Sequence, residues 1–80
     1  MNNMKKITVY STSFCPYCVT LKEFLKKKGV EFEDVNLSED KEAAREMIDK
    51  SGQTGVPVTD IDGQIVVGFD REKITQLLEL

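Results

Sequence analysis

Hydrophobic residues in the first half of the chain form two short runs, separated by a stretch in which they recur at helical spacing. Residues 7–10 are β-branched or aromatic, which predicts a buried central strand. The hydrophobic residues that follow recur at helical spacing, which predicts a helix over residues 16–28. Gly29 is placed to end this helix, because glycine readily takes the left-handed conformation common after a helix C-terminus. Residues 30–37 alternate imperfectly between hydrophobic and polar side chains, which predicts a half-buried strand with a bend.

The middle of the chain predicts a second helix. Ser38 is a suitable N-cap, and the acids that follow it would lie at the positive end of the helix dipole. Lys50 and Gly52 are typical of the end of such a helix. The hydrophobic residues of this segment form one stripe that is expected to pack on the core, namely Ala43, Ala44, Met47 and Ile48.

A hairpin and a third helix are predicted for the remaining residues. Asp62 and Gly63 stand between the β-prone runs 58–61 and 64–67, which is a strong hairpin signal. Pro57 lacks a backbone donor, which suits a turn or a sheet edge. Asp70 is suited to cap the last helix, with Phe69 and Ile74 as its hydrophobic staple. The residues of this helix expected to face the core are Ile74, Leu77 and Leu78.

The resulting order of elements is βαβαββα. A strand, a helix and a strand of these lengths form a βαβ unit, for which a right-handed parallel crossover is the rule. Because the later hairpin is antiparallel, the pattern predicts an α/β fold with a mixed sheet and helices packed against it. With 80 residues, the chain is expected to form one domain over residues 1–80, with one modest core and no separate cofactor-binding domain.

The charge pattern excludes some classes of partner. The net charge is −3, and 14 acidic and 11 basic residues are spread along the chain, so nucleic acid binding is not expected. Lys26, Lys27 and Lys28 are the densest cationic cluster. We interpret them as complementing the dipole at a helix C-terminus, with a partner-docking patch as the alternative. Residues 1–6 lead into the first strand without a hydrophobic stretch, so neither a signal peptide nor a membrane span is expected, and a cytoplasmic location is predicted.

The reactive chemistry of the chain is concentrated in its two cysteines, Cys15 and Cys18. Pro16 fits the first position of the predicted helix, which makes Cys15 the N-cap. The sulfur of Cys15 would then lie among unpaired backbone N–H groups at the positive end of the helix dipole, which favours the thiolate. Cys18 lies about one turn further along and is expected to be less exposed, yet close enough for a disulfide.

Two other roles for a cysteine pair are weighed against redox chemistry. A structural zinc site needs four ligands, whereas the chain has two cysteines and no histidine, so only a dimer that shares one metal or cluster could complete it. The cysteines could also fill the core or form a structural staple. Pro16 between them, at a junction between strand and helix, favours a redox site of the thioredoxin type, and no metal ligand is assigned.

The sequence resembles the glutaredoxins of the thioredoxin superfamily over essentially its whole length. Three separated motifs carry the resemblance: residues 10–18, which contain Cys-Pro-Tyr-Cys, residues 54–57 with the sequence Thr-Gly-Val-Pro, and residues 68–70 with the sequence Gly-Phe-Asp. Cys-Pro-Tyr-Cys is the usual active site of dithiol glutaredoxins. The resemblance implies a thioredoxin-like fold with a four-stranded mixed sheet, three flanking helices, and a cis peptide bond between Val56 and Pro57 that faces Cys15.

The resemblance also implies the residues of the site. The catalytic residues would be Cys15 and Cys18, supported by Pro16, Tyr17 and Pro57. The residues that would bind glutathione are Tyr17, Gln53, Val56, Pro57, Phe69 and Asp70. Among these, the backbone of Val56 would pair with the ligand backbone, and the helix N-terminus at Phe69 and Asp70 would receive the γ-glutamyl carboxylate. Phe14 and Tyr17 are expected to border the exposed sulfur.

The chain departs from the pattern of many glutaredoxins in several places. Thr12 stands where a lysine is common, which removes a charge that would favour the thiolate of Cys15 and attract the glycyl carboxylate of glutathione. Arg71 stands where an acid commonly meets the ammonium group of glutathione, and Gly55 replaces a frequent threonine. In the last motif, Val67 precedes Gly68 where many relatives have two glycines. Glutathione use is therefore less secure than thiol–disulfide exchange.

The predicted function is a thiol–disulfide oxidoreductase that reduces protein disulfides and glutathione mixed disulfides through Cys15 and Cys18. Glutathione is the expected co-substrate, no tightly bound cofactor is expected, and the expected partners are disulfide-containing or glutathionylated proteins. One alternative is a redoxin that takes electrons from thioredoxin reductase, for example to supply ribonucleotide reductase. Another, of a different class, is a redox-responsive or iron–sulfur-binding module. A monomer without membrane contact is expected.

Overall fold

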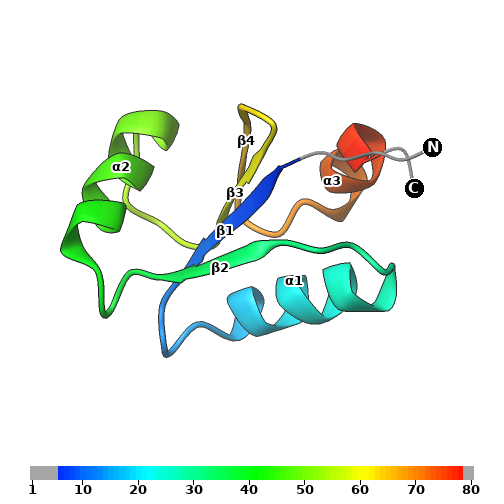
Figure 1. Cartoon of the computed structure of the whole chain (residues 1–80), viewed down its shortest axis with the longest axis horizontal. Helices are drawn as coiled ribbons and strands as arrows, with labels where there is room; N and C mark the ends of the chain where they lie inside the picture. The colour runs from blue at the N-terminus through cyan, green and yellow to red at the C-terminus, as the bar shows by residue number, and fades with distance from the viewer. Residues whose placement is uncertain (1–5, 79–80) are drawn as a thin grey trace.

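A computed structural model describes residues 6–78, and its elements follow the predicted order (Figure 1). The strands are β1 (Ile7–Ser11), β2 (Glu33–Asn36), β3 (Val58–Ile61) and β4 (Gln64–Val67). The helices are α1 (Pro16–Lys27), α2 (Lys41–Ser51) and α3 (Arg71–Leu78). This is the thioredoxin-like α/β fold that was predicted. Residues 1–5, which carry most of the N-terminal segment considered above, lie outside the described part.

The four strands form one mixed sheet in the order β2-β1-β3-β4. Strand β1 pairs with β2 in parallel, as expected for a βαβ unit, and with β3 in antiparallel orientation. The β3–β4 hairpin turns at Asp62 and Gly63, which both have positive φ. This confirms the hairpin predicted from the Asp-Gly pair.

The helices cover the two faces of the sheet unequally. Helices α1 and α3 pack on one face, against a core cluster of Ile7, Val9, Leu21, Leu25, Ile61, Val66, Ile74 and Leu78. Helix α2 packs on the other face against a smaller cluster of Tyr10, Ala43, Met47 and Val58. Figure 1 shows α2 standing apart from α1 and α3. The alternation of side chains along β1 explains both clusters, because Ile7 and Val9 face α1 whereas Tyr10 faces α2.

The end of α1 follows the prediction closely. Lys28 is the C-cap, and Gly29 takes a left-handed φ of 71°. The N–H of Gly29 donates to the carbonyl of Lys26, and the N–H of Val30 donates to that of Leu25. These two hydrogen bonds form a Schellman motif, which satisfies carbonyls that the helix leaves unpaired.

The start of α2 differs from the prediction. Ser38 was predicted as the N-cap, but Asp40 holds that position and its carboxylate accepts hydrogen bonds from the N–H groups of Glu42 and Ala43. Ser38 lies in the turn before the helix, where its N–H donates to Asn36 Oδ1 and its hydroxyl accepts from the N–H of Ser13. The prediction of Ser38 was wrong because these contacts engage it in the turn.

Two further boundaries are narrower than predicted. Strand β2 covers four residues, Glu33–Asn36, rather than residues 30–37. Ile48 was expected in the core stripe of α2 but is 40% exposed, so Ala43 and Met47 form the buried face of this helix. Within the described residues, no helix has the length and hydrophobicity required to cross a membrane.

Candidate active site

Cys15 is the N-cap of α1 and Pro16 is its first residue, as the sequence predicts. Cys15 has an extended backbone, and its Sγ accepts a hydrogen bond of 3.2 Å from the N–H of Cys18. The carbonyl of Cys15 also accepts from the N–H groups of Cys18 and Val19. The sulfur therefore lies at the end of the helix where backbone donors and the helix dipole stabilise negative charge.

The two cysteines differ in exposure and are joined as a disulfide in this structure. Their Cα atoms are 5.2 Å apart, which agrees with the predicted closeness of the pair. Cys15 is half-buried, whereas Cys18 is fully buried on the sheet side of α1. An incoming thiolate can therefore reach the sulfur of Cys15 more easily than that of Cys18.

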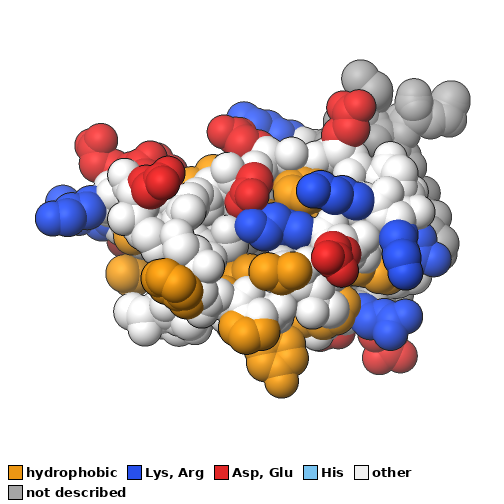
Figure 2. Space-filling model, turned by 90° about the horizontal axis from the view of Figure 1, so that it is seen from below, with side chains coloured by type: hydrophobic (Ala, Val, Ile, Leu, Met, Phe, Trp, Pro, Cys, Tyr) orange, Lys and Arg blue, Asp and Glu red, His pale blue; other side chains and the backbone are white. Residues whose placement is uncertain are grey.

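Two aromatic side chains near the disulfide point into solvent. Phe14 is 94% exposed and Tyr17 is 68% exposed. Figure 2, which looks onto the side covered by α1, shows hydrophobic side chains that protrude from the lower part of the view. Phe14 and Tyr17 flank Cys15 in the sequence and both rings are exposed, so they are available to contact a substrate at the sulfur of Cys15.

The peptide bond between Val56 and Pro57 is cis, as the family resemblance implied. The side chain of Val56 packs on the core cluster under α2, and Pro57 is buried. Among the described residues, no hydrogen bond engages the backbone N–H or C=O of Val56. Unpaired backbone groups favour pairing with an extended ligand. The N–H of Gly68 donates to the carbonyl of Pro57 at 2.8 Å, which joins this motif to the last one.

The start of α3 carries the third motif. Asp70 Oδ1 accepts a hydrogen bond of 3.1 Å from the N–H of Lys73, which confirms Asp70 as a cap. The ring of Phe69 meets that of Phe24 edge to face, with centroids 5.9 Å apart. The guanidinium of Arg71 lies over the same Phe24 ring, with 5.5 Å between Cζ and the centroid. Arg71 therefore contacts α1, a position that sequence analysis did not foresee.

The side chain of Gln53 is engaged within its own loop. Its Oε1 accepts from the N–H of Gly55 at 2.7 Å, and its Nε2 donates to the carbonyl of Gly55 at 3.0 Å. Nε2 also lies 3.3 Å from the hydroxyl of Ser51. Gln53, predicted to bind glutathione, must therefore give up these hydrogen bonds before its amide can turn to a ligand. We call this pair of contacts with Gly55 the Gln53–Gly55 clasp.

A polar network anchors the segment that leads into the active site. Ser11, at the end of β1, is buried, and its hydroxyl donates to Asp34 Oδ1 at 3.1 Å. Lys22 Nζ donates to the same hydroxyl and pairs with Asp34 Oδ2 at 3.0 Å. These contacts link β1 and β2 to α1 one turn after Cys18. They restrain the strand and the helix between which the Cys15 loop runs.

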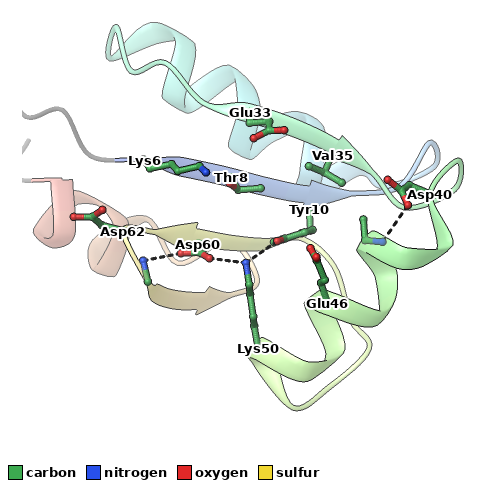
Figure 3. Close-up of a pocket in the computed structure, with 12 residues that line it drawn as sticks. Lys6, Thr8, Tyr10, Glu33, Val35, Asp40, Glu46, Lys50, Asp60 and Asp62 are labelled. Atoms are coloured by element: carbon green, nitrogen blue, oxygen red, sulfur yellow. Dashed lines mark hydrogen bonds and ion pairs between the residues drawn. The ribbon is translucent and has the colours of Figure 1, made fainter.

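A pocket of about 410 Å³ lies on the other face of the sheet, beside α2 (Figure 3). In it, Lys50 Nζ donates to Tyr10 Oη and pairs with Asp60 Oδ2, each at 2.9 Å. The hydrogen bonds to Tyr10 and then to Asp60 raise the pKa of Lys50 above its ordinary value, despite partial desolvation. Asp60 Oδ1 also accepts from the N–H of Gly63 in the hairpin turn. This network ties α2 to the sheet, and the pocket lies opposite the face that α1 and Cys18 cover.

The structure thus brings the predicted site residues into contact in small groups. Cys15 and Cys18 are bonded, Pro57 and Gly68 are hydrogen-bonded, and Phe69 packs against α1. Within residues 6–78, no group of three or more His, Cys, Asp or Glu side chains is arranged to hold a metal ion.

Comparisons with known proteins agree with this geometry. The glutaredoxin family model matches residues 7–66. A glutaredoxin-like 8.6 kDa protein in the rubredoxin operon of Clostridium pasteurianum is 48% identical over 73 residues, which cover 91% of this chain and 97% of that protein. Glutaredoxin 3 of Escherichia coli is 37% identical over 67 residues, which cover 84% of this chain and 81% of that protein. The crystal structure of a mutant of the thioredoxin-like protein BC3987 has a TM-score of 0.88 and 41% identity, and the match covers 95% of this chain and 97% of that one.

Proposed function

The chain belongs to the glutaredoxin family of thiol–disulfide oxidoreductases, and we propose that it reduces protein disulfides and glutathione mixed disulfides with glutathione as the electron donor. The observation that carries this proposal is the difference between the two sulfurs. Cys15 is half-buried at a helix N-terminus, whereas Cys18 is fully buried one turn behind it. We also propose the cytoplasm as the compartment, because a catalytic role is the expected use of a vicinal cysteine pair in a reducing compartment.

Reduction of a protein disulfide follows from this arrangement. The Cys15 thiolate attacks one substrate sulfur, forms a mixed disulfide and expels the other substrate sulfur as a thiolate. Cys18, after losing its proton, attacks the Cys15 sulfur and releases the second substrate thiolate. The substrate has then gained two electrons, and the protein holds the Cys15–Cys18 disulfide seen in the structure.

Two molecules of glutathione return the protein to its dithiol form. The first glutathione thiolate attacks Cys15, the more accessible sulfur, and Cys18 leaves as a thiolate that takes up a proton. The second glutathione thiolate attacks the sulfur of the bound glutathione, which yields glutathione disulfide and the Cys15 thiolate. The unpaired backbone of Val56 supports pairing with the glutathione backbone during these steps. The N-terminus of α3 at Phe69 and Asp70 suits its γ-glutamyl carboxylate.

A second candidate is reduction by thioredoxin reductase instead of glutathione. Two observations favour it: Thr12 supplies no positive charge near Cys15, and Arg71 lies over Phe24 where the family commonly has an acid for the glutathione ammonium. In this candidate, a dithiol of the reductase attacks Cys15, and both electrons pass to the Cys15–Cys18 disulfide without a free glutathione intermediate.

A coupled assay on a small mixed disulfide tests the proposal. NADPH consumption is followed with glutathione plus glutathione reductase, and separately with thioredoxin reductase. Turnover with glutathione supports the proposal, whereas turnover only with thioredoxin reductase contradicts it and selects the second candidate. Cys15→Ser should abolish turnover, because it removes the attacking sulfur. Cys18→Ser should retain reduction of glutathione mixed disulfides, because external glutathione can resolve the Cys15 intermediate.

A further inference from the structure

A second surface groove, of about 540 Å³, lies between α1 and the start of α3. It is distinct from the pocket of Figure 3, which is on the other face of the sheet. Its lining residues are Thr20, Glu23, Phe24, Lys27, Lys28, Phe69 and Arg71. We refer to it as the α1–α3 groove.

The floor of the α1–α3 groove is aromatic and its walls are basic. Phe24 and Phe69 meet edge to face at 5.9 Å. Two cations lie against the Phe24 ring, Arg71 at 5.5 Å and Lys28 at 5.9 Å from its centroid. Figure 2 shows several Lys and Arg side chains on the right of the face that α1 covers, which is the side of its C-terminal half in Figure 1. Such contacts hold the cationic groups in place while part of each remains open to a ligand.

No acid among residues 6–78 forms an ion pair with the basic residues of the groove. Within residues 6–78, the ion pairs are Lys22–Asp34 and Lys50–Asp60, so Lys27, Lys28 and Arg71 have no carboxylate within 4.0 Å. Among the described residues, Glu23 is the single acid that lines the groove. The groove is therefore locally positive, although the whole chain has a net charge of −3.

The helix dipole explains only part of this cluster. Lys27 belongs to the last turn of α1, where a cation is favourable. Arg71 is the first residue of α3, where the dipole is positive and a cation is unfavourable. Two different helices thus direct cations without a carboxylate partner among residues 6–78 into one groove, and the charge of Arg71 is held there by the Phe24 ring rather than favoured by the dipole of α3.

The groove begins close to the reactive cysteine. Thr20 lines it, and its hydroxyl donates to the carbonyl of Pro16 one turn earlier, at 3.2 Å. At a rise of about 1.5 Å per residue, Phe24 lies roughly 13 Å along the helix axis from Cys15. About four extended residues span this distance, so a segment next to a partner cysteine bonded to Cys15 can reach the groove.

We propose that the α1–α3 groove docks an acidic segment of the protein that exchanges electrons with Cys15 and Cys18. This inference rests on the proposed thiol–disulfide exchange with proteins. The basic side chains select carboxylates by charge, and the aromatic floor offers apolar contact to the segment that carries them. The docking adds no chemical step. It raises the rate at which an acidic partner presents its disulfide to Cys15.

Two synthetic peptide disulfides test this inference. Each peptide carries one cysteine, which is blocked as a disulfide with 2-mercaptoethanol. Four charged or neutral residues stand on each side of this cysteine, close enough to reach the groove when the cysteine reacts with Cys15. The acidic peptide has glutamate at these positions and the neutral peptide has glutamine. The measured quantity is the ratio of the initial rates at which the reduced protein releases the two peptide thiols. In low salt, we expect the acidic peptide to react about tenfold faster, and the ratio to fall as salt is added.

Matched variants assign the preference to the groove. Lys27→Gln with Arg71→Gln should bring the ratio close to one. Lys41→Gln with Arg45→Gln removes the same charge from exposed positions on α2 and should leave the ratio as in the wild type. Glu23→Gln should increase the ratio, because it removes the single acid of the groove.

The outcomes separate this inference from the proposed function. Equal rates for both wild-type peptides, or an equal fall of the ratio in the α2 control, would overturn acidic docking at the groove. Millimolar pyrophosphate is then added as a competing anion. If it lowers the ratio of acidic to neutral peptide rates equally in the wild type and in the α2 control, the result supports an anion site in the groove. If it leaves the ratio unchanged, the proposed anion site is overturned. If the wild type fails to reduce even hydroxyethyl disulfide, thiol–disulfide exchange itself fails.

Discussion

Replacement of Gly55 by alanine should improve the use of glutathione, because it opens the Gln53–Gly55 clasp. A Cβ at position 55 would lie 2.8 Å from Gln53 Oε1, closer than nonbonded atoms tolerate. The backbone of Gly55 does not have a positive φ, so alanine fits it. The atom that meets the new Cβ is the end of a flexible side chain, so the amide of Gln53 should move and the backbone should stay.

The size of the effect follows from the hydrogen bonds that the clasp contains. Gln53 makes two of them with Gly55, at 2.7 and 3.0 Å. Each has a net worth of about 0.5–1.5 kcal/mol, and the exposed position of Gly55 favours the lower part of that range. If Gln53 binds glutathione, as the family resemblance implies, the ligand has to replace about 1–2 kcal/mol of these contacts in the wild type, which corresponds to roughly 5- to 30-fold in affinity. Gly55→Ala should therefore raise kcat/KM for glutathione by about fivefold or more.

The coupled assay with glutathione reductase measures this effect when glutathione is the varied substrate. Gln53→Ala serves as the reference background, because it removes the amide from both the clasp and the ligand. In that background, Gly55→Ala should change kcat/KM very little. An equal gain in both backgrounds, or no gain in the wild-type background, would refute the reasoning that Gln53 is held back from glutathione by Gly55.

Two further predictions concern stability. Thr59 is fully buried in β3 and its hydroxyl has no hydrogen-bond partner among the described residues, so Thr59→Val should raise the free energy of unfolding by about 1 kcal/mol; urea unfolding of the oxidised protein checks this, and a loss of stability would contradict it. Because the pKa of Lys50 is raised in the folded protein, its hydrogen bonds contribute their full stability below the unfolded pKa of about 10.5, and this stability is lost as pH rises from there toward the folded pKa. Unfolding measured from pH 9 to 11 should show the onset of this loss, and Lys50→Met should reduce it.

The helices and the hairpin could be predicted from the sequence because the start of a helix, its end and a tight turn each depend on residues that are neighbours in the chain. Pro16 at the start of α1, Gly29 at its end and the Asp-Gly turn all behave as their local chemistry requires. Ser38 failed as a predicted cap because one of its partners, Ser13, lies 25 positions away in sequence. Both Ser38 and Asp40 have the side chain of a good cap, so propensity could not choose between them.

The site was predicted to a similar extent. The positions of Cys15 and Cys18 followed from local helix chemistry, and the cis bond before Pro57 came from the family resemblance, because most bonds before proline are trans. The contact between Arg71 and Phe24 joins α3 to α1 and links two residues that are 47 positions apart in sequence. No local pattern in the sequence predicts such a contact, which places the guanidinium of Arg71 against α1.

In this site, the residues suited to exchange disulfides differ from those that would distinguish one partner from another. Cys15 and the backbone of Val56 are open, and these suit any extended chain that carries a disulfide. Gln53, which the family resemblance assigns to glutathione binding, is instead hydrogen-bonded to Gly55, and Arg71 places a cation over Phe24 where the family commonly has an acid for the glutathione ammonium. Glutathione and protein partners would thus compete for the same central contacts and be distinguished at the periphery. It follows that Gly55→Ala should alter kcat/KM for glutathione without changing the ratio of acidic to neutral peptide rates, because the clasp contributes no residue to the α1–α3 groove.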